Sequence, residues 1–336
     1  MTLTQRRSRG KMDGMSRFRS LAFVALVAVA TACTGGDGDP DPTPTRDSPE
    51  LNAILATTDH YVGAPQRIGI GLVLNDQRLV SYGSADFRFS YLGTSQTPTD
   101  ARPGPSATGV YLPTPGTAAG GATAEITQPS EARGVYQAED VTFDEEGFWQ
   151  VEVSVDVEGQ GPMTATTVLP VNGEPLLPAP GMSALETENL TLDSEDAPLA
   201  AIDSRAVSEG EVPDEILHET TIADALEAGR PALVVFSTPL FCQTQFCGPI
   251  TDVVEGLARE HGDRAEFIHV EIWREYEETS QVINQAAADW LLRNNDLTEP
   301  WLYLIDGNGT IVDRWAVLFR PEEIAAALEA LPRSRA

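Results

Sequence analysis

The sequence predicts two folded parts of different class, an all-β domain over residues 51–173 and an α/β domain over residues 215–336. The first part contains short segments rich in β-branched and aromatic residues, separated by Gly, Pro, Asn and Asp, a pattern typical of consecutive strands. In the second part, short apolar runs alternate with segments of helical periodicity, as in α/β folds. Residues 174–214, rich in Pro, Glu, Asp, Ser and Ala, are long for a loop within one domain and are predicted to be an interdomain linker, with a course along a domain surface left open.

The first 32 residues carry the features of an export signal. A basic segment precedes an apolar run at residues 21–30, and an Ala-x-Ala site precedes Cys33. The apolar run is too short for a permanent transmembrane helix. This arrangement resembles a bacterial lipoprotein signal, although Ala30 stands where such signals usually carry a larger aliphatic residue. The resemblance implies lipidation of Cys33 and a protein anchored on the extracytoplasmic face of the cell membrane. The alternative is ordinary cleavage that leaves Cys33 as a free thiol outside the cytoplasm.

The segment after the signal and the overall charge restrict the possible partners. Residues 33–50 are mostly Gly, Asp, Pro and Thr, so they cannot bury a core and are predicted to be a flexible tether. The formal charge of the chain is −29 at pH 7, and removal of the basic signal segment makes it more negative. A surface this acidic repels phosphate backbones, so nucleic acid is not expected as a partner.

The strands of the first domain are expected at residues 67–74, 85–92, 134–143, 147–157 and 163–171. The alternation is clearest at 147–157, where Trp149 and four valines at every second position form one face and polar residues form the other. Regular strands separated by turn signals predict an antiparallel sandwich. The general pattern resembles immunoglobulin-like modules of extracytoplasmic proteins. His60, near the start of the domain, is interpreted as a surface or packing histidine.

The second domain is expected to have the element order α-β-α-β-α-β-β-α. The predicted elements are a helix at 221–227, a strand at 233–236, a helix beginning near Cys247, a strand at 265–272, a helix at 281–294, strands at 301–305 and 311–317, and a helix beginning at Pro321. Thr221 followed by Asp224 is a form of the capping box that begins helices. Residues 306–309, Asp-Gly-Asn-Gly, are typical of a tight hairpin turn.

Two cysteines, Cys242 and Cys247, lie between the strand at 233–236 and the helix that follows. With Cys33 assigned to the membrane, these two are far too few for a disulfide-rich scaffold, so the pair needs its own explanation. Backbone N–H groups and the dipole at a helix N-terminus favour a thiolate and lower the pKa of a cysteine placed there. Across a bending loop, the two Cα atoms can reach the roughly 4.4 to 6.8 Å that a disulfide needs. The pattern therefore predicts a redox site.

Three short motifs make residues 215–336 similar to a thioredoxin-fold domain. They are Gly229-Arg230-Pro231 before the first strand, Cys247-Gly248-Pro249 at the start of the long helix, and Glu299-Pro300 before the third strand. The resemblance implies that Pro300 is the proline that, in thioredoxin-like proteins, is cis and packs against the active cysteines.

The sequence departs from the thioredoxin pattern in three respects. The usual Cys-x-x-Cys is replaced by a Cys-x4-Cys arrangement of Cys242 and Cys247, and Ile250 stands at the position of the second active cysteine. Val235 occupies the place of the buried acid that assists thiol chemistry in thioredoxin. Glu299 is expected to place a negative charge near the thiols and to oppose thiolate formation.

The resulting prediction is a thiol-disulfide oxidoreductase that acts on partner proteins carrying thiols or disulfides. Cys247 is assigned as the attacking thiolate because it matches the helix-end cysteine, and Cys242 as the resolving cysteine, with the reverse order left open. Phe241, Phe246 and Trp301 are expected to form an apolar rim where a partner polypeptide docks. Neither a cofactor nor a metal is expected.

Two functions of other classes stay open. One is a non-catalytic surface binding protein in which Cys242 and Cys247 form a permanent bridge. The other is copper handling, because copper-binding proteins of the Sco type resemble this domain in placing two cysteines in the same loop, and soft cuprous ion binds two thiolates. Such proteins add a histidine late in the domain, whereas His269, the last histidine here, lies inside a predicted strand. His218 is interpreted as a connector residue and His261 as a surface residue at a helix end.

Overall fold

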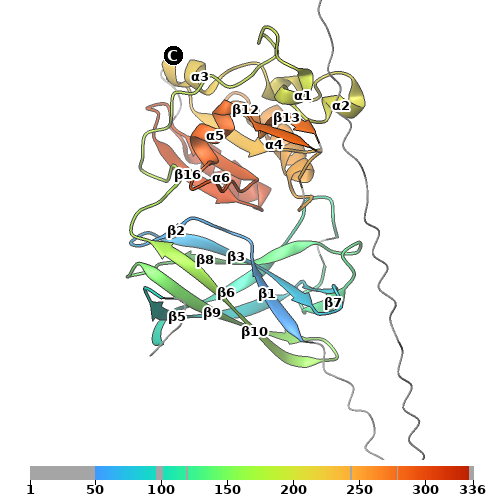
Figure 1. Cartoon of the computed structure of the whole chain (residues 1–336), viewed down its shortest axis with the longest axis vertical. Coiled ribbons are helices and arrows are strands. Elements are labelled where there is room, and N and C mark those ends of the chain that lie inside the picture. Colours follow the sequence, from blue (N-terminus) through green and yellow to red (C-terminus); the bar gives the residue numbers. More distant parts are fainter. Residues whose placement is uncertain (1–49, 96–100, 119, 243, 278, 333–336) are drawn as a thin grey trace, which may run out of the picture. The chain divides into compact units, whose positions relative to one another are not determined.

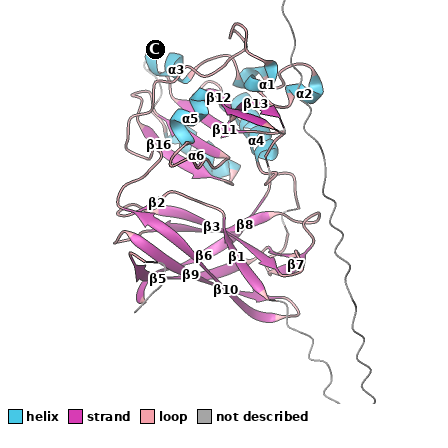
Figure 2. Ribbon diagram, in the orientation of Figure 1, coloured by secondary structure: helices cyan, strands magenta, loops and turns pink. Residues whose placement is uncertain are grey.

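Strands provide the regular secondary structure of the N-terminal part and mixed helices and strands that of the C-terminal part, in agreement with the predicted β and α/β classes (Figures 1 and 2). The computed structural model describes residues 50–95, 101–118, 120–242, 244–277 and 279–332. The predicted signal segment, the lipidation site Cys33 and the tether as far as residue 49 lie outside the described residues. Within the described residues, no helix has both the length and the apolar composition that crossing a bilayer requires.

The described strands of the N-terminal part belong to a single hydrogen-bonded sheet. They are β1 (Leu51–Leu55), β2 (His60–Tyr61), β3 (Gln66–Leu74), β4 (Leu79–Ser81), β5 (Ser84–Gly93), β6 (Arg102–Pro113), β7 (Glu125–Thr127), β8 (Gly134–Val141), β9 (Gly147–Val157) and β10 (Gly161–Asn172). The order is β2-β10-β9-β5-β6-β8-β3-β4-β7, with β1 paired to β3. The named pairs are antiparallel except for the short parallel pair of β2 and β10. The sequence analysis did not predict β1, β2, β4, β6 or β7.

Strand β9 carries the core of this sheet, and its predicted alternation is confirmed. Trp149 and Val153 are 0% exposed, and the valines at 151, 155 and 157 are at most 3% exposed. In the register, Val153 lies between Phe87 of β5 and Ala165 of β10, which are also buried. Because side chains alternate between the two faces of a strand, this register buries the whole apolar face at once.

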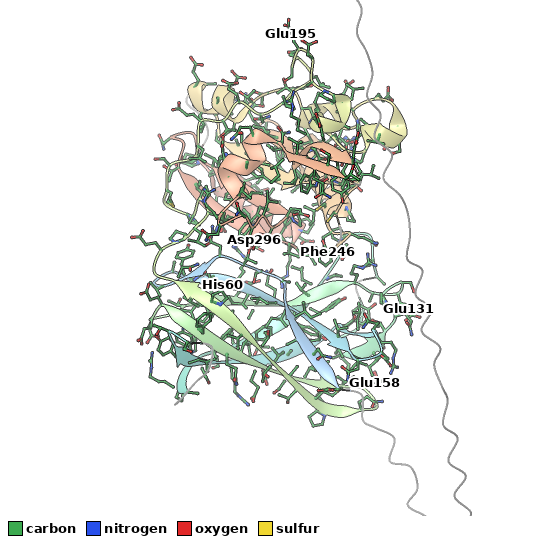
Figure 3. The ribbon with its side chains drawn as sticks, in the orientation of Figure 1. His60, Glu131, Glu158, Glu195, Phe246 and Asp296 are labelled. Atoms are coloured by element: carbon green, nitrogen blue, oxygen red, sulfur yellow. The ribbon has the colours of Figure 1, made fainter. Side chains whose placement is uncertain are left out.

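His60 is a packing histidine and not a surface one. Its side chain is 2% exposed, and Nε2 lies 3.1 Å from the hydroxyl oxygen of Thr57 (Figure 3). Burial, with a smaller contribution from the positive charge of Arg314, lowers the pKa of His60 to about 4. The ring is therefore neutral at physiological pH.

The C-terminal part has the predicted element order with one hairpin added. Its elements are α3 (Ile222–Glu227), β11 (Ala232–Ser237), α4 (Cys247–His261), β12 (Glu266–Glu271), β13 (Trp273–Glu277), β14 (Ser280–Ile283), α5 (Gln285–Leu291), β15 (Trp301–Ile305), β16 (Ile311–Ala316) and α6 (Pro321–Ala330). The expectation of one helix over residues 281–294 was wrong at both ends. Residues 281–283 pair with β13, and α5 ends at Leu291 because the next residue has an extended backbone.

The central sheet of this part has the strand order β12-β11-β15-β16, with β11 parallel to β12 and antiparallel to β15. All six residues of β11 are buried, as expected for an apolar strand covered on both faces. Leu233 and Val235 pack with apolar residues of α4 and α6, whereas Val234 and Phe236 pack with those of α3 and α5. The helices therefore cover both faces of the sheet, and the segment after β11 emerges at its carboxyl end. The predicted capping box at Thr221 is confirmed.

Residues 174–214, predicted to be a linker, are packed against the α/β part. Gly181 donates a backbone hydrogen bond to Ile311 of β16, and Ile311 donates one to Met182, each at 2.9 Å. The segment then forms the short helices α1 (Leu199–Ile202) and α2 (Ala206–Glu209), followed by the 3-10 turn η1 (Glu215–Leu217). Asp203 and Ser204, between α1 and α2, are 0% exposed.

Residues 48–336 form one compact unit, in which a buried ion pair joins the sheet part to β16. Arg314 Nη1 lies 2.8 Å from Asp59 Oδ2, and the two side chains are 8% and 4% exposed. Arg314 also donates to the carbonyl of Pro178 at 2.9 Å. Asp59 accepts hydrogen bonds from the backbone N–H groups of Leu176 and Leu177. Both charges are thus paired and hydrogen-bonded, as burial requires.

Replacing Arg314 with Met is expected to lower the free energy of unfolding by about 3 to 5 kcal/mol, because Asp59 is left buried without its cation. Urea unfolding followed by tryptophan fluorescence measures the change. Arg320→Met is the matched control, since Arg320 pairs with Glu139 in a half-exposed bridge and its loss should cost at most about 1 kcal/mol. Equal losses in the two variants would contradict this account of the interface.

Candidate functional site

Cys242 lies in the middle of the loop that joins β11 to α4, and Cys247 is the first residue of α4. The backbone N–H of Cys242 donates to the carbonyl of Thr238 at 3.1 Å, which turns the chain back after β11. Helix α4 begins at Cys247, as predicted. Both cysteines are free thiols, and their Sγ atoms and a carboxylate oxygen of Glu299 lie within 4.8 Å of one another. The fold thus brings together two sulfurs and one carboxyl group.

Cys242 is the more acidic of the two thiols. A hydrogen bond from the Cys247 thiol lowers the pKa of Cys242 to about 5, against an opposing effect of burial. Further hydrogen bonds come from Thr244, whose hydroxyl oxygen lies 3.1 Å from the sulfur, and from the backbone N–H groups of Cys247 and Phe246. These N–H groups belong to the N-terminus of α4, so the predicted stabilisation of a thiolate by this helix end reaches Cys242.

Cys247 has the opposite environment. Its side chain is 0% exposed, and burial raises the pKa of its thiol far above the usual range, with the hydrogen bond to Cys242 and the charges of Cys242 and Glu299 acting in the same direction. At neutral pH, Cys247 therefore stays protonated and donates its S–H to the Cys242 thiolate. The sequence pattern predicted attack by Cys247, with the reverse order left open. Burial and hydrogen bonding favour the reverse order.

Glu299 is a half-buried acid held beside the dithiol. It precedes Pro300, and the Glu299–Pro300 peptide bond is cis. Burial, followed by the charges of Cys242 and Glu271, raises the pKa of Glu299 to about 7. A carboxyl group with this pKa exists in both protonation states at neutral pH, which suits it for accepting and returning a proton.

A cavity of about 520 Å³ adjoins the dithiol. Its lining includes Phe241, Thr244, Phe246, Glu299, Pro300 and Trp301, so the residues expected to form a docking rim share one cavity. Phe246, labelled in Figure 3, is 8% exposed, and Trp301 is 3% exposed, so these two rings form the wall of the cavity and not an exposed edge.

Two aromatic residues of this cavity were missed by the sequence analysis. Phe241 stacks on Tyr276 with ring centroids 4.2 Å apart, and Tyr276 in turn meets the edge of Trp273. Both residues lie on β13, which the sequence analysis assigned to no element. Their spacing of three residues gave no strand signal, because the register of β13 shifts between Trp273 and Glu275.

The sheet part contributes the opposite side of the same cavity. Ile54, Leu55 and Ala56, from β1 and the residue after it, line it together with Thr58. The Thr58 hydroxyl oxygen lies 3.1 Å from that of Thr298, the residue before Glu299. The two parts of the chain therefore build the surroundings of the dithiol together.

Two groups of side chains in the described residues have the composition of a metal site. In the first, Cys242 and Cys247 are soft ligands suited to cuprous ion, but Glu299 supplies a hard oxygen that such an ion binds poorly. The second group combines His269 with two residues that the sequence analysis did not single out as ligands, Asp203 and His218. His269 is therefore not part of the dithiol site.

Comparison of the sequence with protein-family models and with curated proteins finds no match. The functional conclusion therefore depends on the geometry of the chain itself.

Replacing Glu299 with Gln is expected to stabilise the reduced protein at high pH. The folded-state pKa of about 7 lies above the ordinary value of 4.5, so stability is lost as pH rises from about 4.5 to 7. Since Gln cannot ionise, the variant should be more stable than the native protein by roughly 2 kcal/mol at pH 8 and nearly equal at pH 4. Urea unfolding at both pH values measures this.

The exposed Glu275→Gln variant is the matched control and should change stability little at either pH. A Glu299→Gln effect of the same size at pH 4 and pH 8 would show that the carboxyl group is not held near neutrality.

Proposed function

We propose that this protein is an extracytoplasmic, membrane-anchored thiol-disulfide oxidoreductase that acts on partner proteins through Cys242 and Cys247. The observation that carries the proposal is the asymmetry of the dithiol. One thiol has a pKa lowered to about 5 and its neighbour has a pKa raised by complete burial, beside a cavity lined with aromatic rings. An attacking thiol and a resolving thiol need such opposite properties.

The architecture around the site supports a thioredoxin-like assignment for residues 215–336. The strand order β12-β11-β15-β16, the loop from β11 into α4, and the cis peptide before Pro300 agree with what the resemblance implies. Val235 and Ile250, which stand in place of functional residues of thioredoxin, are buried in the core. Glu299 has a carboxylate oxygen within 4.8 Å of both sulfurs. It therefore assists the thiol chemistry in place of the buried acid that is missing at the position of Val235. The antiparallel N-terminal sheet supports the immunoglobulin-like assignment only in general pattern.

In the first step, the Cys242 thiolate attacks one sulfur of a partner disulfide. A bond forms between Cys242 Sγ and that sulfur, the partner disulfide breaks, and the other partner sulfur leaves as a thiolate that takes a proton from water. Cys242 is 8% exposed and Cys247 is 0% exposed, so the outer sulfur is the one that a partner reaches. The aromatic cavity beside it suits the apolar side chains that flank a partner cysteine.

In the second step, Cys247 resolves the mixed disulfide. Once Cys242 is no longer a thiolate, the Cys247 thiol loses its hydrogen-bond acceptor, and its proton passes to the Glu299 carboxylate, directly or through one water. The Cys247 thiolate then attacks Cys242 Sγ, so that a Cys242–Cys247 disulfide forms and the bond from Cys242 to the partner sulfur breaks. The partner sulfur leaves as a thiolate and takes the proton back from Glu299. The partner gains two electrons, and an external dithiol must supply them before the next cycle. The reverse sequence oxidises a partner dithiol.

A permanent disulfide between Cys242 and Cys247 would explain neither the acid beside the two sulfurs nor the aromatic cavity. Such a bridge gains nothing from an acid with a pKa of about 7 beside it, and burying that carboxyl group costs stability. It also leaves the aromatic cavity without a purpose. Two parts of the proposal, the lipid anchor at Cys33 and the location outside the cytoplasm, rest on the sequence alone.

The Cys247→Ser variant is expected to accumulate mixed disulfides through Cys242, because the outer cysteine still attacks and the inner one can no longer resolve. A peptide with one intramolecular disulfide serves as probe, and partner proteins are trapped in cells. Non-reducing gels and mass spectrometry identify the adducts. Cys242→Ser should give at least tenfold fewer adducts, and the variant lacking both cysteines should give none.

More adducts with Cys242→Ser than with Cys247→Ser would reverse the assigned order. An absence of adducts in both variants would contradict exchange activity and favour the structural bridge.

A further inference from the structure

A second buried cluster lies apart from the dithiol and has no part in the proposed exchange. It consists of Asp203 after α1, His218 after η1, and His269 in the middle of β12, and we call it the histidine cluster. The three side chains are each 0% exposed. Asp203 Oδ2 lies 3.5 Å from His218 Nε2 and 3.4 Å from His269 Nδ1.

Three ring nitrogens of this cluster have no hydrogen-bond partner among the described residues. They are both nitrogens of His218 and Nδ1 of His269. The contacts of 3.4 and 3.5 Å to Asp203 are longer than the roughly 2.7 to 3.2 Å of an N–H···O hydrogen bond. Leaving a buried polar group without a partner destabilises the folded state, so three such nitrogens in one place require an explanation.

The protonation of His269 is set by its other nitrogen. Nε2 lies 3.2 Å from the backbone carbonyl oxygen of Ser237, and since a carbonyl only accepts, Nε2 carries a hydrogen and donates it. In the neutral ring, Nδ1 then holds a lone pair toward the Asp203 carboxylate, which is repulsive unless a cation lies between them. Metal-binding histidines commonly donate their second ring N–H to a backbone carbonyl in this way.

The separations match the edges of a tetrahedral metal site. Zinc lies about 2.0 to 2.2 Å from nitrogen and oxygen ligands, so two ligands of a regular tetrahedron are about 3.4 Å apart. The two measured separations, 3.4 and 3.5 Å, have this value, and all three ligand atoms lie within 4.8 Å of one another.

The surrounding charges leave room for a cation. Arg205 binds the Asp203 carboxylate, with Nη2 at 2.7 Å from Oδ2, but the same guanidinium also pairs with Asp214 and Asp252. One positive charge therefore faces three carboxylates, and the excess negative charge favours a divalent ion.

A proton on His269 is the competing explanation. Although burial lowers it, the contact with Asp203 raises the pKa of His269, so an imidazolium could pair with the carboxylate. That arrangement leaves both nitrogens of His218 without a hydrogen-bond partner among the described residues. A metal ion engages both rings at once.

We propose that Asp203, His218 and His269 bind one divalent transition-metal ion of the zinc class. Two imidazole nitrogens and a carboxylate oxygen suit Zn²⁺ and Co²⁺, and the complete burial of the ligands indicates a structural ion acquired during folding.

The site ties the chain segment before the α/β domain to its central sheet. Asp203 and His218 belong to the segment between α1 and α3, and His269 belongs to β12. Next to Asp203, the Ser204 hydroxyl accepts a hydrogen bond from the backbone N–H of Leu240, in the loop that carries Cys242. The ion thus anchors the residues on which that loop rests.

The test uses a variant in which Cys33, Cys242 and Cys247 are Ser, so that no thiolate competes for metal. The protein is unfolded, stripped with a chelator and refolded with Zn²⁺ or Co²⁺ alone. One equivalent of metal should remain after gel filtration, and the Co²⁺ form should show the visible spectrum of tetrahedral nitrogen and oxygen coordination. Refolding with Zn²⁺ should raise the Tm relative to the metal-free protein.

His218→Gln and Asp203→Asn in this background should each lower the affinity for Zn²⁺ at least tenfold. His60→Gln is the matched control, because His60 is an equally buried histidine of the sheet part and should leave binding unchanged. Retention of full affinity by His218→Gln would overturn the proposal.

Where a variant fails to fold, X-ray absorption of the Zn²⁺-loaded cysteine-free protein decides. Two imidazole ligands per ion support the proposal, and fewer than two contradict it. Failure to retain one equivalent of either metal also contradicts it. None of these measurements depends on exchange activity.

Discussion

The difference in acidity between the two thiols depends on the removal of one sulfur atom from water. Cys247, the first residue of α4, is completely buried, so its thiol cannot ionise at moderate cost and instead donates a hydrogen bond to Cys242. That donation and the N-terminus of α4 make the outer sulfur a thiolate. In the proposed exchange, the burial of one cysteine therefore determines which sulfur attacks and which one resolves the mixed disulfide.

The sheet part contributes residues to the cavity beside the dithiol. Residues 54–56 and Thr58 form part of the cavity beside the dithiol, and a buried ion pair of Arg314 with Asp59 fixes them relative to β16. Here residues of the sheet part line a cavity of about 520 Å³ beside the dithiol, and in the proposed exchange this cavity receives the partner segment that reaches Cys242.

The sequence allowed prediction of the features that depend on neighbouring residues. The alternation at 147–157, the helix beginning at Cys247 and the capping box at Thr221 are local patterns, and the structure confirms each. Features that depend on tertiary packing were missed. The β13–β14 hairpin was assigned in part to a helix, and the complete burial of Asp203 and Ser204 within residues 174–214 had no compositional signal.

In the candidate site, too, features set by local motifs could be predicted and features set by tertiary packing could not. The proximity of Cys242, Cys247 and Glu299 could be expected from the motifs, whereas the distribution of acidity between the two sulfurs could not, because it depends on the depth of burial of each. The histidine cluster joins residues far apart in the chain, and a lone aspartate in an acidic connecting segment gives no sign of being a ligand.

The most direct measurement is the pH dependence of alkylation of each cysteine in the reduced protein, followed by peptide mass spectrometry. Cys242 is expected to react first with iodoacetamide, and its alkylation rate should rise with pH with a midpoint near pH 5. The midpoint should stay low in Cys247→Ser, because the serine hydroxyl still donates a hydrogen bond to the Cys242 sulfur. It should rise in Cys247→Ala, which has no donor. Faster alkylation of Cys247, or a Cys242 midpoint near the ordinary thiol value of about 8.5, would contradict this account of the dithiol.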